Sequence, residues 1–266
     1  MGEKFITRHD LVKNNKKLLI YVVAYKATKH IKSVLDLIPY EKYDNHEVLV
    51  SDDASGDETS QIVEKYIAEN PAKKIKLVTQ LVNLGYGGNQ KFGYDYAIKN
   101  NFDVVVLIHG DGQYSPILIP QIVDPIMQDE TEVILGSRMM NKKSALQGGM
   151  PLYKFVGNIV LTKAQNLLLG MKLAEYHTGL RAFSIKALAR TPFKENNGGF
   201  AFDTDILIQL IDTKAMIGEV AIPTHYGDEI CRVNGVKYAG EIMLSTVLSR
   251  AQRLGIYKSK KFNYDV

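Results

Sequence analysis

The sequence has a single cysteine, Cys231, so no disulfide bond can form within the chain. A chain without disulfides fits a reducing compartment, and we expect the protein to be cytoplasmic. Glycine and proline, at 21 and 8 of 266 residues, are too few for a disordered or fibrous chain. No run of about 18 apolar residues occurs, so we expect no membrane-spanning helix. The first residues, MGEKFITRHDLVKNNKK, lack the apolar run of a signal peptide.

The sequence also lacks a strong excess of either charge. Its 33 Lys and Arg residues against 29 Asp and Glu residues give a net charge of +4. This excess is too small to predict nucleic-acid binding, and we expect none. It is compatible with a surface that meets phosphates or anionic lipid headgroups. A lipid substrate would have to be reached from the membrane surface or through a partner, so we consider peripheral membrane association, a membrane partner or a homo-oligomer.

Hydrophobic residues make up 45% of the chain, enough for one substantial core, and we predict a single domain over residues 1–266. Strand patterns rich in β-branched residues alternate with helical patterns about every 25 residues. The predicted strands are 17–25, 46–54, 74–80, 102–112, 132–138, 178–184 and 219–227. The predicted helices are 30–38, 57–70, 87–100, 117–128, 152–169, 202–212 and 236–256. The alternation predicts βαβ units and an α/β fold with a mostly parallel sheet flanked by helices.

The two ends of the chain differ from this pattern. Residues 1–16 are polar, and we expect a loose N-terminal arm. Residues 236–266 are predicted to form a C-terminal amphipathic helix and a basic tail. One face of this helix carries apolar side chains that suit either a lipid interface or the domain core, and for the helix itself we favour packing on the core. These side chains are Val236, Met243, Val247, Ala251 and Leu254.

Polar residues follow the predicted strands at the point where each strand ends. Ligands of parallel sheets bind outside the carboxyl ends of the strands. The segment SDDASGDET (51–59) places Asp52 and Asp53 there, where a carboxylate can accept hydrogen bonds from a base or a ribose hydroxyl. An Asp-rich turn without a ligand explains this segment equally well. The segment NLGYGGNQKFG (83–93) adds glycines that would let the backbone and a helix N-terminus approach a diphosphate, and we favour this reading over a plain glycine-rich helix start.

The segment LIHGDGQYSP (107–116) carries the strongest signal. His109 and Asp111 are two residues apart, so they point the same way in an extended chain, and Gln113 continues the series. An imidazole, a carboxylate and an amide oxygen suit Mn²⁺ or Mg²⁺, with a donor diphosphate completing the coordination shell. The alternative is a polar loop with His109 packed in the protein. Three arginines near predicted strand ends suit phosphate or, equally, surface ion pairs: Arg138, Arg181 and Arg232.

Taken together, these segments resemble the family 2 glycosyltransferases, which have the GT-A fold. SDDASGDET is similar to that family's D-D-G-S-x-D-x-T, and HGDGQYSP is similar to its D-A-D-G-Q-x-x-P with the D-x-D metal motif. VVAYKATKHI resembles the N-terminal strand and loop, and NLGYGGNQKFGYDYAI the segment between. Within the family, the segments GSR, TGLRAFS and HYGDEICRVN resemble the dolichyl-phosphate mannose synthases and related polyprenyl-phosphate sugar transferases. The resemblance covers residues 18–235.

The resemblance implies an inverting transfer from a nucleoside-diphosphate sugar, and the acceptor that we expect from it is a polyprenyl (dolichyl-type) phosphate. It implies that Tyr25 and Asp53 touch the nucleoside, that Asp111 and Gln113 bind the metal, and that Arg138 and Arg232 hold phosphates. From the matched segments we expect donor contacts at Ala24, Tyr25, Asp52, Asp53, Asn83, Gly85, Asn89, Gly110 and Asp111. We expect phosphate or acceptor contacts at Arg138, Arg181 and Arg232. The expected catalytic groups are Asp111, Glu175, Arg138 and Asp203.

The sequence departs from the family pattern in the first loop, where Lys26 and Ala27 replace Asn-Glu, and in D-x-D, where His109 replaces the first Asp. Glu175 stands near the usual Asp ahead of the T-G-F-R segment. A phosphate acceptor is already ionised and needs no strong base, whereas a sugar hydroxyl needs one, for which Glu175 and Asp203 are candidates. The alternatives are transfer to a hydroxyl of a glycan or protein, and a non-catalytic nucleotide-sugar-binding protein.

Overall fold

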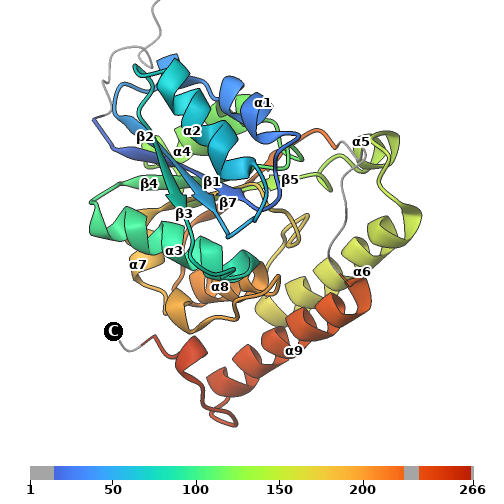
Figure 1. Ribbon diagram of the computed structural model, residues 1–266. Coiled ribbons are helices and arrows are strands. Elements are labelled where there is room, and N and C mark those ends of the chain that lie inside the picture. Colours follow the sequence, from blue (N-terminus) through green and yellow to red (C-terminus); the bar gives the residue numbers. More distant parts are fainter. Residues whose placement is uncertain (1–14, 225–233, 265–266) are drawn as a thin grey trace, which may run out of the picture.

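A computed structural model describes residues 15–224 and 234–264 of the protein. Within these residues, seven strands form one sheet in the order β3–β2–β1–β4–β6–β5–β7 (Figure 1). The strands are β1 (Leu18–Ala24), β2 (His46–Asp52), β3 (Ile75–Thr79), β4 (Val104–His109), β5 (Val133–Ser137), β6 (Arg181–Ser184) and β7 (Ile217–Ala221). The α-helices are α1 (Ile31–Asp36), α2 (Thr59–Glu69), α3 (Tyr86–Lys99), α4 (Ile119–Met127), α5 (Lys142–Gln147), α6 (Leu152–Leu169), α7 (Ile185–Ala189), α8 (Phe202–Asp212) and α9 (Gly235–Arg253).

The sheet is parallel except at β6, which runs antiparallel to both β4 and β5. This arrangement confirms the predicted α/β fold with a mostly parallel sheet. The last strand ends at Ala221, several residues before the predicted end of the segment 219–227. Because β6 runs the other way, its amino end lies at the same edge as the carboxyl ends of the parallel strands.

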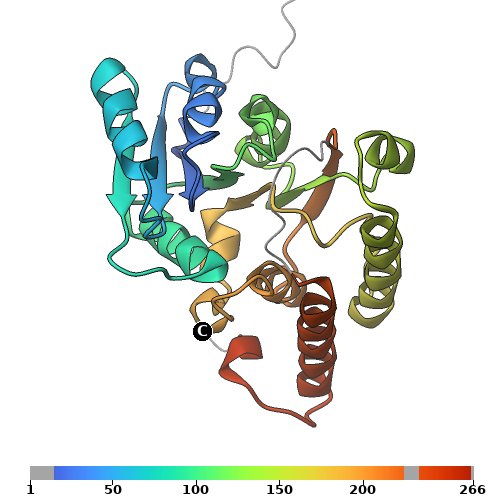
Figure 2. The same ribbon diagram turned by 45° about the vertical axis from the view of Figure 1, so that its right-hand side comes forward.

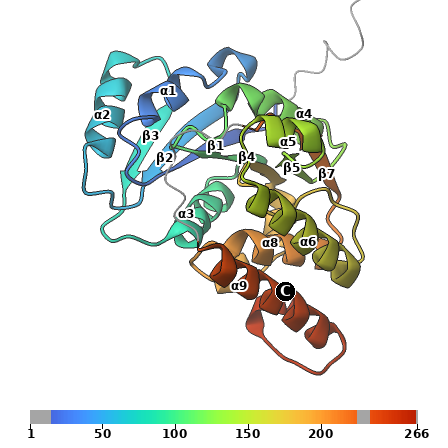
Figure 3. The ribbon, with the colours of Figure 1, turned by 90° about the vertical axis from the view of Figure 1, so that its right-hand side faces the viewer.

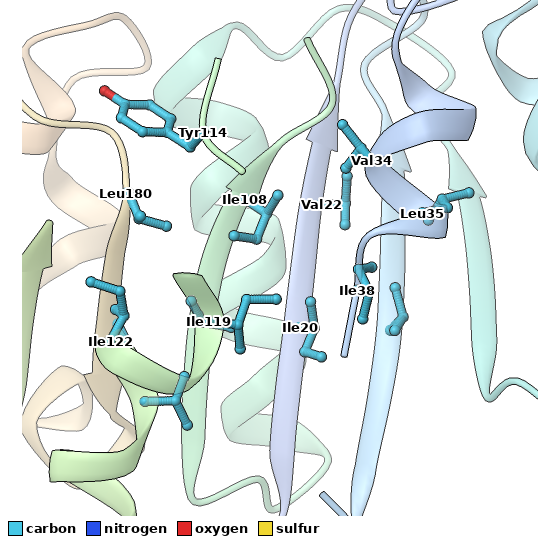
Figure 4. Close-up of a cluster of buried hydrophobic side chains, with 14 of the residues drawn as sticks. Ile20, Val22, Val34, Leu35, Ile38, Ile108, Tyr114, Ile119, Ile122 and Leu180 are labelled. Atoms are coloured by element: carbon cyan, nitrogen blue, oxygen red, sulfur yellow. The ribbon is translucent and has the colours of Figure 1, made fainter. Parts of the chain in front are cut away.

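Both faces of the sheet are buried, as the alternation along β1 shows. Ile20 and Val22 point into a layer that includes side chains of α1, α2 and α4 (Figure 4). Leu19 and Tyr21 point the opposite way, into a layer with side chains of α3, α7 and α8. Gly93 in α3 is required here, because a Cβ atom at that position would lie 2.1 Å from the ring of Tyr21. Two packed layers therefore fix the sheet and its ligand-binding edge.

Helices α6 and α9 lie side by side at one margin of the molecule (Figures 1 and 3). The preferred prediction for the C-terminal helix, packing of its apolar face on the core, is wrong. Val236, Val247 and Leu254 are exposed, whereas the buried positions of α9 carry mainly Ser and Thr. Within the described residues, no helix is long and apolar enough to cross a membrane.

The chain after α9 turns back to α8 (Figure 2). Phe262 is buried in the core, and the side-chain amide of Gln209 donates a hydrogen bond to the carbonyl of Lys261 at 2.7 Å. The ammonium group of Lys261 pairs with the Asp205 carboxylate at 2.7 Å. Part of the basic tail is therefore engaged with the protein itself.

Candidate active site

The strand register brings the polar segments together at the carboxyl edge of the sheet. Ala24, at the end of β1, pairs with Asp52 on one side, and the preceding Val23 pairs with His109 on the other. Tyr25, which follows β1, is 39% exposed, so its ring is accessible from solvent. The loops that carry the D-D and H-x-D segments therefore flank the same central strand, where ligands of open parallel sheets bind.

The two adjacent aspartates do different work. Asp52 is buried, and its carboxylate accepts hydrogen bonds from Ser55 and, at 2.6 Å, from the Ser60 hydroxyl. Asp53 accepts a hydrogen bond from the Leu84 amide at 2.7 Å, and its carbonyl accepts one from the Asn83 side chain at 2.9 Å. Burial raises the pKa of Asp53, and backbone amides including that of Leu84 partly oppose the rise. Asp52 therefore holds the turn, and Asp53 ties it to the glycine-rich segment.

The glycines of that segment make packing contacts within the protein, whereas the preferred prediction was that they let a diphosphate approach. The amides of Gly87 and Gly88, in the first turn of α3, donate to the carbonyl of Gly198 at 2.8 and 3.1 Å. A Cβ atom on Gly87 would lie 2.7 Å from the Asn197 carbonyl oxygen. Gly85 has a φ of +77°, which favours glycine. The loop at 197–199 thus occupies the helix start that a phosphate would need.

Asn89 is also engaged within the protein. Its side-chain oxygen accepts hydrogen bonds from the hydroxyls of Tyr21 and Ser51, at 2.9 and 2.6 Å, and its amide donates to the Ser51 carbonyl at 3.2 Å. The residue is buried. It ties α3 to β1 and β2, and a direct donor contact by Asn89 has no support in this geometry.

His109 lies in a chain of polar contacts that reaches Asp203. The Tyr86 hydroxyl donates to the Asp203 carboxylate at 2.9 Å, and Nε2 of His109 lies 3.2 Å from the same hydroxyl oxygen. Because the phenol has one proton and gives it to Asp203, Nε2 of His109 is the donor to Tyr86. Burial, with the charge of Asp203, raises the pKa of Tyr86 well above its usual range, so the phenol stays protonated. In neutral His109, Nδ1 then carries the lone pair.

The packing around the His109 ring leaves little freedom. Its ring makes edge contacts with Tyr86 and Tyr114, with centroids 5.6 and 5.4 Å away. A Cβ atom on Gly179 would lie 2.4 Å from its Cε1 atom. The Tyr114 hydroxyl accepts a hydrogen bond from the Gly179 amide at 2.9 Å. The ring is therefore held by its neighbours on several sides.

Asp111 and Gln113 lie in the loop after β4, and the Asp111 side chain is exposed. Its carboxylate accepts a hydrogen bond from the backbone N–H of Gln113 at 3.0 Å. Gly110 is buried, and its amide donates to the Val23 carbonyl at 2.8 Å, which fixes the start of the loop against β1. No group of three or more His, Cys, Asp or Glu side chains in the described ranges is arranged to hold a metal ion. An exposed carboxylate and an amide oxygen fit a divalent cation whose remaining ligands come from a diphosphate.

Arg138 and Glu175 form a buried ion pair, which argues against Glu175 as a general base. Nε and the backbone amide of Arg138 donate to the two carboxylate oxygens of Glu175, at 3.1 and 2.7 Å. The Asn158 amide adds a hydrogen bond at 2.9 Å. Burial alone would raise the pKa of Glu175, but the charge and hydrogen bonds of Arg138 outweigh it, and the pKa lies below its usual range. The guanidinium of Arg138 is likewise engaged with the protein, since it also donates to the carbonyl of His177.

Arg181 is fully buried, which argues against the predicted phosphate contact. Its guanidinium donates to the carbonyls of Tyr176, Thr178 and Asp203 at 2.8, 2.7 and 2.6 Å. Asp203 is buried too, and its two oxygens accept from Gln90 and Tyr86. Arg181 therefore braces the chain between β6 and α8. The third predicted arginine, Arg232, lies outside the described residues.

Comparison with known proteins identifies the family. Residues 20–191, more than half of the chain, match the sequence pattern of the family described as glycosyl transferase family 2. The chain belongs to glycosyl transferase family 2.

Two relatives of this family 2 glycosyltransferase match most of its length. A UDP-N-acetylglucosamine–dolichyl-phosphate N-acetylglucosaminyltransferase of Methanococcus voltae is 32% identical over 220 residues, covering 78% of this chain and 86% of the relative. A dolichyl-phosphate beta-glucosyltransferase of Saccharomyces cerevisiae is 24% identical over 269 residues, covering 92% of this chain and 77% of the relative.

A solved structure supports the fold. Glucosyl-3-phosphoglycerate synthase from Mycobacterium tuberculosis, in complex with Mg²⁺ and uridine diphosphate, superimposes with a TM-score of 0.66 at 21% identity. The match covers 97% of this chain and 86% of that one. The likeness confirms the GT-A fold that the sequence resemblance predicted.

Three residues of this glycosyltransferase site were not predicted from the sequence: Tyr86, Gln90 and Tyr114. Tyr86 joins His109 to Asp203, Gln90 donates to Asp203 at 3.0 Å, and Tyr114 holds Gly179. The tyrosines stand within segments that the sequence had singled out, NLGYGGN and GDGQYSP. No spacing rule separates such a tyrosine from a core residue, because its partners lie far away in the chain.

Proposed function

We propose that this family 2 glycosyltransferase transfers a sugar, with inversion, from a nucleoside-diphosphate sugar to a polyprenyl phosphate. The observation that favours a phosphate acceptor is that both carboxylates predicted as general bases are already hydrogen-bonded within the protein. Each oxygen of Glu175 and of Asp203 accepts a hydrogen bond within the protein, and both residues are buried. A sugar hydroxyl needs a base to become a nucleophile, whereas a phosphate is already ionised near neutral pH. The names of the Methanococcus voltae and Saccharomyces cerevisiae relatives, both of which act on dolichyl phosphate, agree with this choice.

On this proposal, the donor lies across the ends of β1, β2 and β4. Tyr25 offers an exposed ring to the nucleobase of the donor. Asp53 offers a buried carboxylate, and the raised pKa of this carboxylate would fall when it accepts a hydrogen bond from an N–H group of the donor. Asp111 and Gln113 would hold Mg²⁺ or Mn²⁺ with the donor diphosphate. A bound divalent cation stabilises the negative charge that develops on the departing nucleotide. Structures of the Mycobacterium tuberculosis synthase with uridine diphosphate and either ion agree with this assignment.

The remaining donor and acceptor contacts stay predictions. Asn83 is placed by its hydrogen bonds to the Asp53 carbonyl and the Gly85 amide, at 2.9 and 3.0 Å, and it would shape the floor of the donor site. Arg138 would act on phosphate only after leaving Glu175. We place the reaction at a membrane surface, because the proposed acceptor is a lipid.

The test is direct transfer with a soluble acceptor. UDP-, GDP- and dTDP-sugars would first be screened by thermal shift, because donor that binds the native state raises the melting temperature. The donor that stabilises most would then be incubated with a short-chain prenyl phosphate, and we expect an acid-labile glycolipid. A product formed only on a hydroxyl acceptor, with none on the phosphate, would overturn the proposed acceptor.

A further inference from the structure

Helix α6 has polar side chains on its buried side and large apolar side chains on its exposed side. Its buried positions carry Asn158, Thr162 and Gln165, together with Leu169. Two of these inward polar groups are hydrogen-bonded to their neighbours: Asn158 donates to Glu175 at 2.9 Å and accepts from Thr162 at 3.1 Å. The outward positions carry large apolar side chains at helical spacing, namely Leu152, Tyr153, Val156, Val160 and Leu167. A helix on a protein surface ordinarily does the reverse, with its apolar stripe on the core.

Helix α9 repeats the inversion beside it. Its buried positions are Ile242, Ser245, Thr246 and Ser249. Its exposed side includes Val236 at 87%, Leu244 at 60% and Val247 at 49% of their full accessible area, and Leu254 and Ile256 follow at 74% and 77%. Gln165 of α6 donates to the Thr246 hydroxyl of α9 at 3.4 Å, so polar groups join the pair on its inner side. Exposed apolar side chains gathered on two adjacent helices are typical of a binding surface.

The positive charge around α6 indicates what kind of partner binds the exposed apolar side chains. From residue 133 to residue 174 the chain has five lysines and one arginine and no Asp or Glu. Lys142, Lys143 and Lys163 of this stretch are exposed. On α6 the exposed apolar side chains have basic neighbours and no acidic ones, and on α9 the Glu241 carboxylate pairs with Lys237 at 3.9 Å. This distribution of charge matches the interface of an anionic bilayer. A symmetric dimer through the same face would bring these lysines toward their own copies, which is unfavourable.

The position of the face agrees with a lipid substrate. Helix α5 begins shortly after Arg138, which follows the carboxyl end of β5, and α6 comes next along the chain. The first turn of α9 returns to the same edge, where the Tyr238 hydroxyl lies 3.1 Å from Nδ1 of His177. Asn158 of α6 likewise donates to Glu175, the partner of Arg138, so both helices contact the chain next to the candidate active site. The two helices run side by side (Figure 3).

We propose that the outward face of α6 and α9 is a docking surface for an anionic lipid bilayer, which presents the polyprenyl phosphate to the active site. This inference rests on the proposed function for its purpose. The binding itself is independent of catalysis and is measured without a sugar donor. Here "docking face" means the exposed apolar side chains of α6 and α9 with the exposed lysines of α5 and α6.

The test is vesicle flotation of the full chain. Vesicles of mixed phosphatidylcholine and phosphatidylglycerol are compared with vesicles of phosphatidylcholine alone. We expect binding to the mixed vesicles, and the double variant Val156→Glu/Val160→Glu should need about tenfold more lipid or more for half-maximal binding. The matched control Leu37→Glu/Met216→Glu makes the same charge change at exposed apolar positions outside the docking face and should bind like wild type. Lys142→Ala/Lys143→Ala/Lys163→Ala should weaken binding to the mixed vesicles.

The outcomes separate this proposal from the proposed function. Transfer to a short-chain prenyl phosphate free in solution should be equal in Val156→Glu/Val160→Glu and wild type, whereas transfer to long-chain acceptor in vesicles should fall. No binding of wild type to mixed vesicles at low salt would overturn the docking face, as would equal loss in the control variant. A stable dimer in light scattering that the Glu variant abolishes would also overturn it, in favour of a second copy. Loss of transfer to every phosphate acceptor, with vesicle binding intact, would instead refute the proposed function.

Discussion

At the scale of single residues, neighbours within one motif have separate roles. The carboxylate of Asp52 accepts hydrogen bonds within the turn that it stabilises, whereas the carboxylate of Asp53, the next residue, accepts one from the backbone of the glycine-rich segment. His109 and Asp111 differ in the same way, since the imidazole is packed among aromatic rings and the carboxylate is exposed. Motif spacing predicts which edge of the sheet is functional, and the individual hydrogen bonds decide which side chain is available there.

Replacing Asp53 by alanine should weaken binding of the nucleoside diphosphate by about 10- to 100-fold, the range for loss of a hydrogen bond to a charged group. The measurement is calorimetry with the nucleotide that stabilises the wild type. Asp129→Ala, which removes an exposed carboxylate paired with Lys16, is the control and should bind normally. Unchanged affinity in Asp53→Ala would remove this residue from the donor site.

Activity should require a divalent cation held by Asp111. Asp111→Asn should lower the transfer rate by about 100-fold or more and leave the melting temperature unchanged, because the side chain is exposed. If Nδ1 of His109 is a ligand, the nitrogen favours Mn²⁺ over Mg²⁺, and His109→Asp should narrow the difference. Asp129→Asn is the matched control. Full activity in excess chelator would refute the metal assignment, and equal rates with both ions would place His109 outside the coordination shell.

At the scale of elements, the start of α3 is docked on the loop at 197–199. Gly87→Ala should lower the free energy of unfolding by about 1–3 kcal/mol, because the added Cβ atom meets backbone oxygens of this loop at 2.7 and 2.8 Å. Gly157→Ala is a matched control within α6, where a Cβ atom meets nothing within 4 Å and should stabilise by about 0.5–1 kcal/mol. Denaturant titration measures both. Equal effects of the two substitutions would show that the close contacts at Gly87 relax without cost.

The elements of the fold differ in how clearly the sequence predicts them. The strands β1, β4 and β5 follow from nearly uninterrupted apolar runs, because a strand buried on both faces leaves such a run. The edge strand β3 is partly exposed and includes Lys76, and it was predicted from its β-branched residues and its place in the alternation. The antiparallel direction of β6 could not be predicted, since the residue pattern of a buried strand is the same in either direction. The role of Gly87 was missed for a related reason: its partner at Gly198 lies more than a hundred residues away. The outward apolar face of α9 was assigned to the core because amphipathicity alone does not state which side is solvent.

At the scale of the whole molecule, stability should fall between pH 6.5 and pH 4 because of His177. Burial, offset in part by Glu175, lowers the pKa of this imidazole from 6.5 to about 4. In that window the unfolded chain binds a proton at this position and the folded protein does not, so lowering the pH favours unfolding. The shift corresponds to about 3 kcal/mol in the free energy of unfolding.

The measurement is the free energy of unfolding by denaturant at several pH values. His177→Gln should show a shallower decline than wild type between pH 6.5 and pH 4, since its amide does not titrate. His30→Gln, at an exposed histidine, is the control and should follow the wild-type curve. Parallel curves for wild type and His177→Gln would mean that the imidazole titrates in the folded protein as it does in the unfolded chain.

Arg138 and Glu175 lie 37 residues apart in the sequence, at the two ends of the segment that contains α5 and α6, and their ion pair joins these ends. Next to it, the Gly136 amide donates to the Leu180 carbonyl at 2.9 Å, so the segment leaves and re-enters the sheet at one point. A segment with joined ends behaves as a cassette, because its length and sequence can change with a small loop-closure cost and without altering strand pairing. Evolution can then vary the contact with the acceptor's surroundings separately from nucleotide recognition. A chimera with a relative's cassette between Arg138 and Glu175 should keep its nucleotide affinity in calorimetry while its vesicle binding follows the cassette, and a lost nucleotide affinity in a folded chimera would show that the two are not separable.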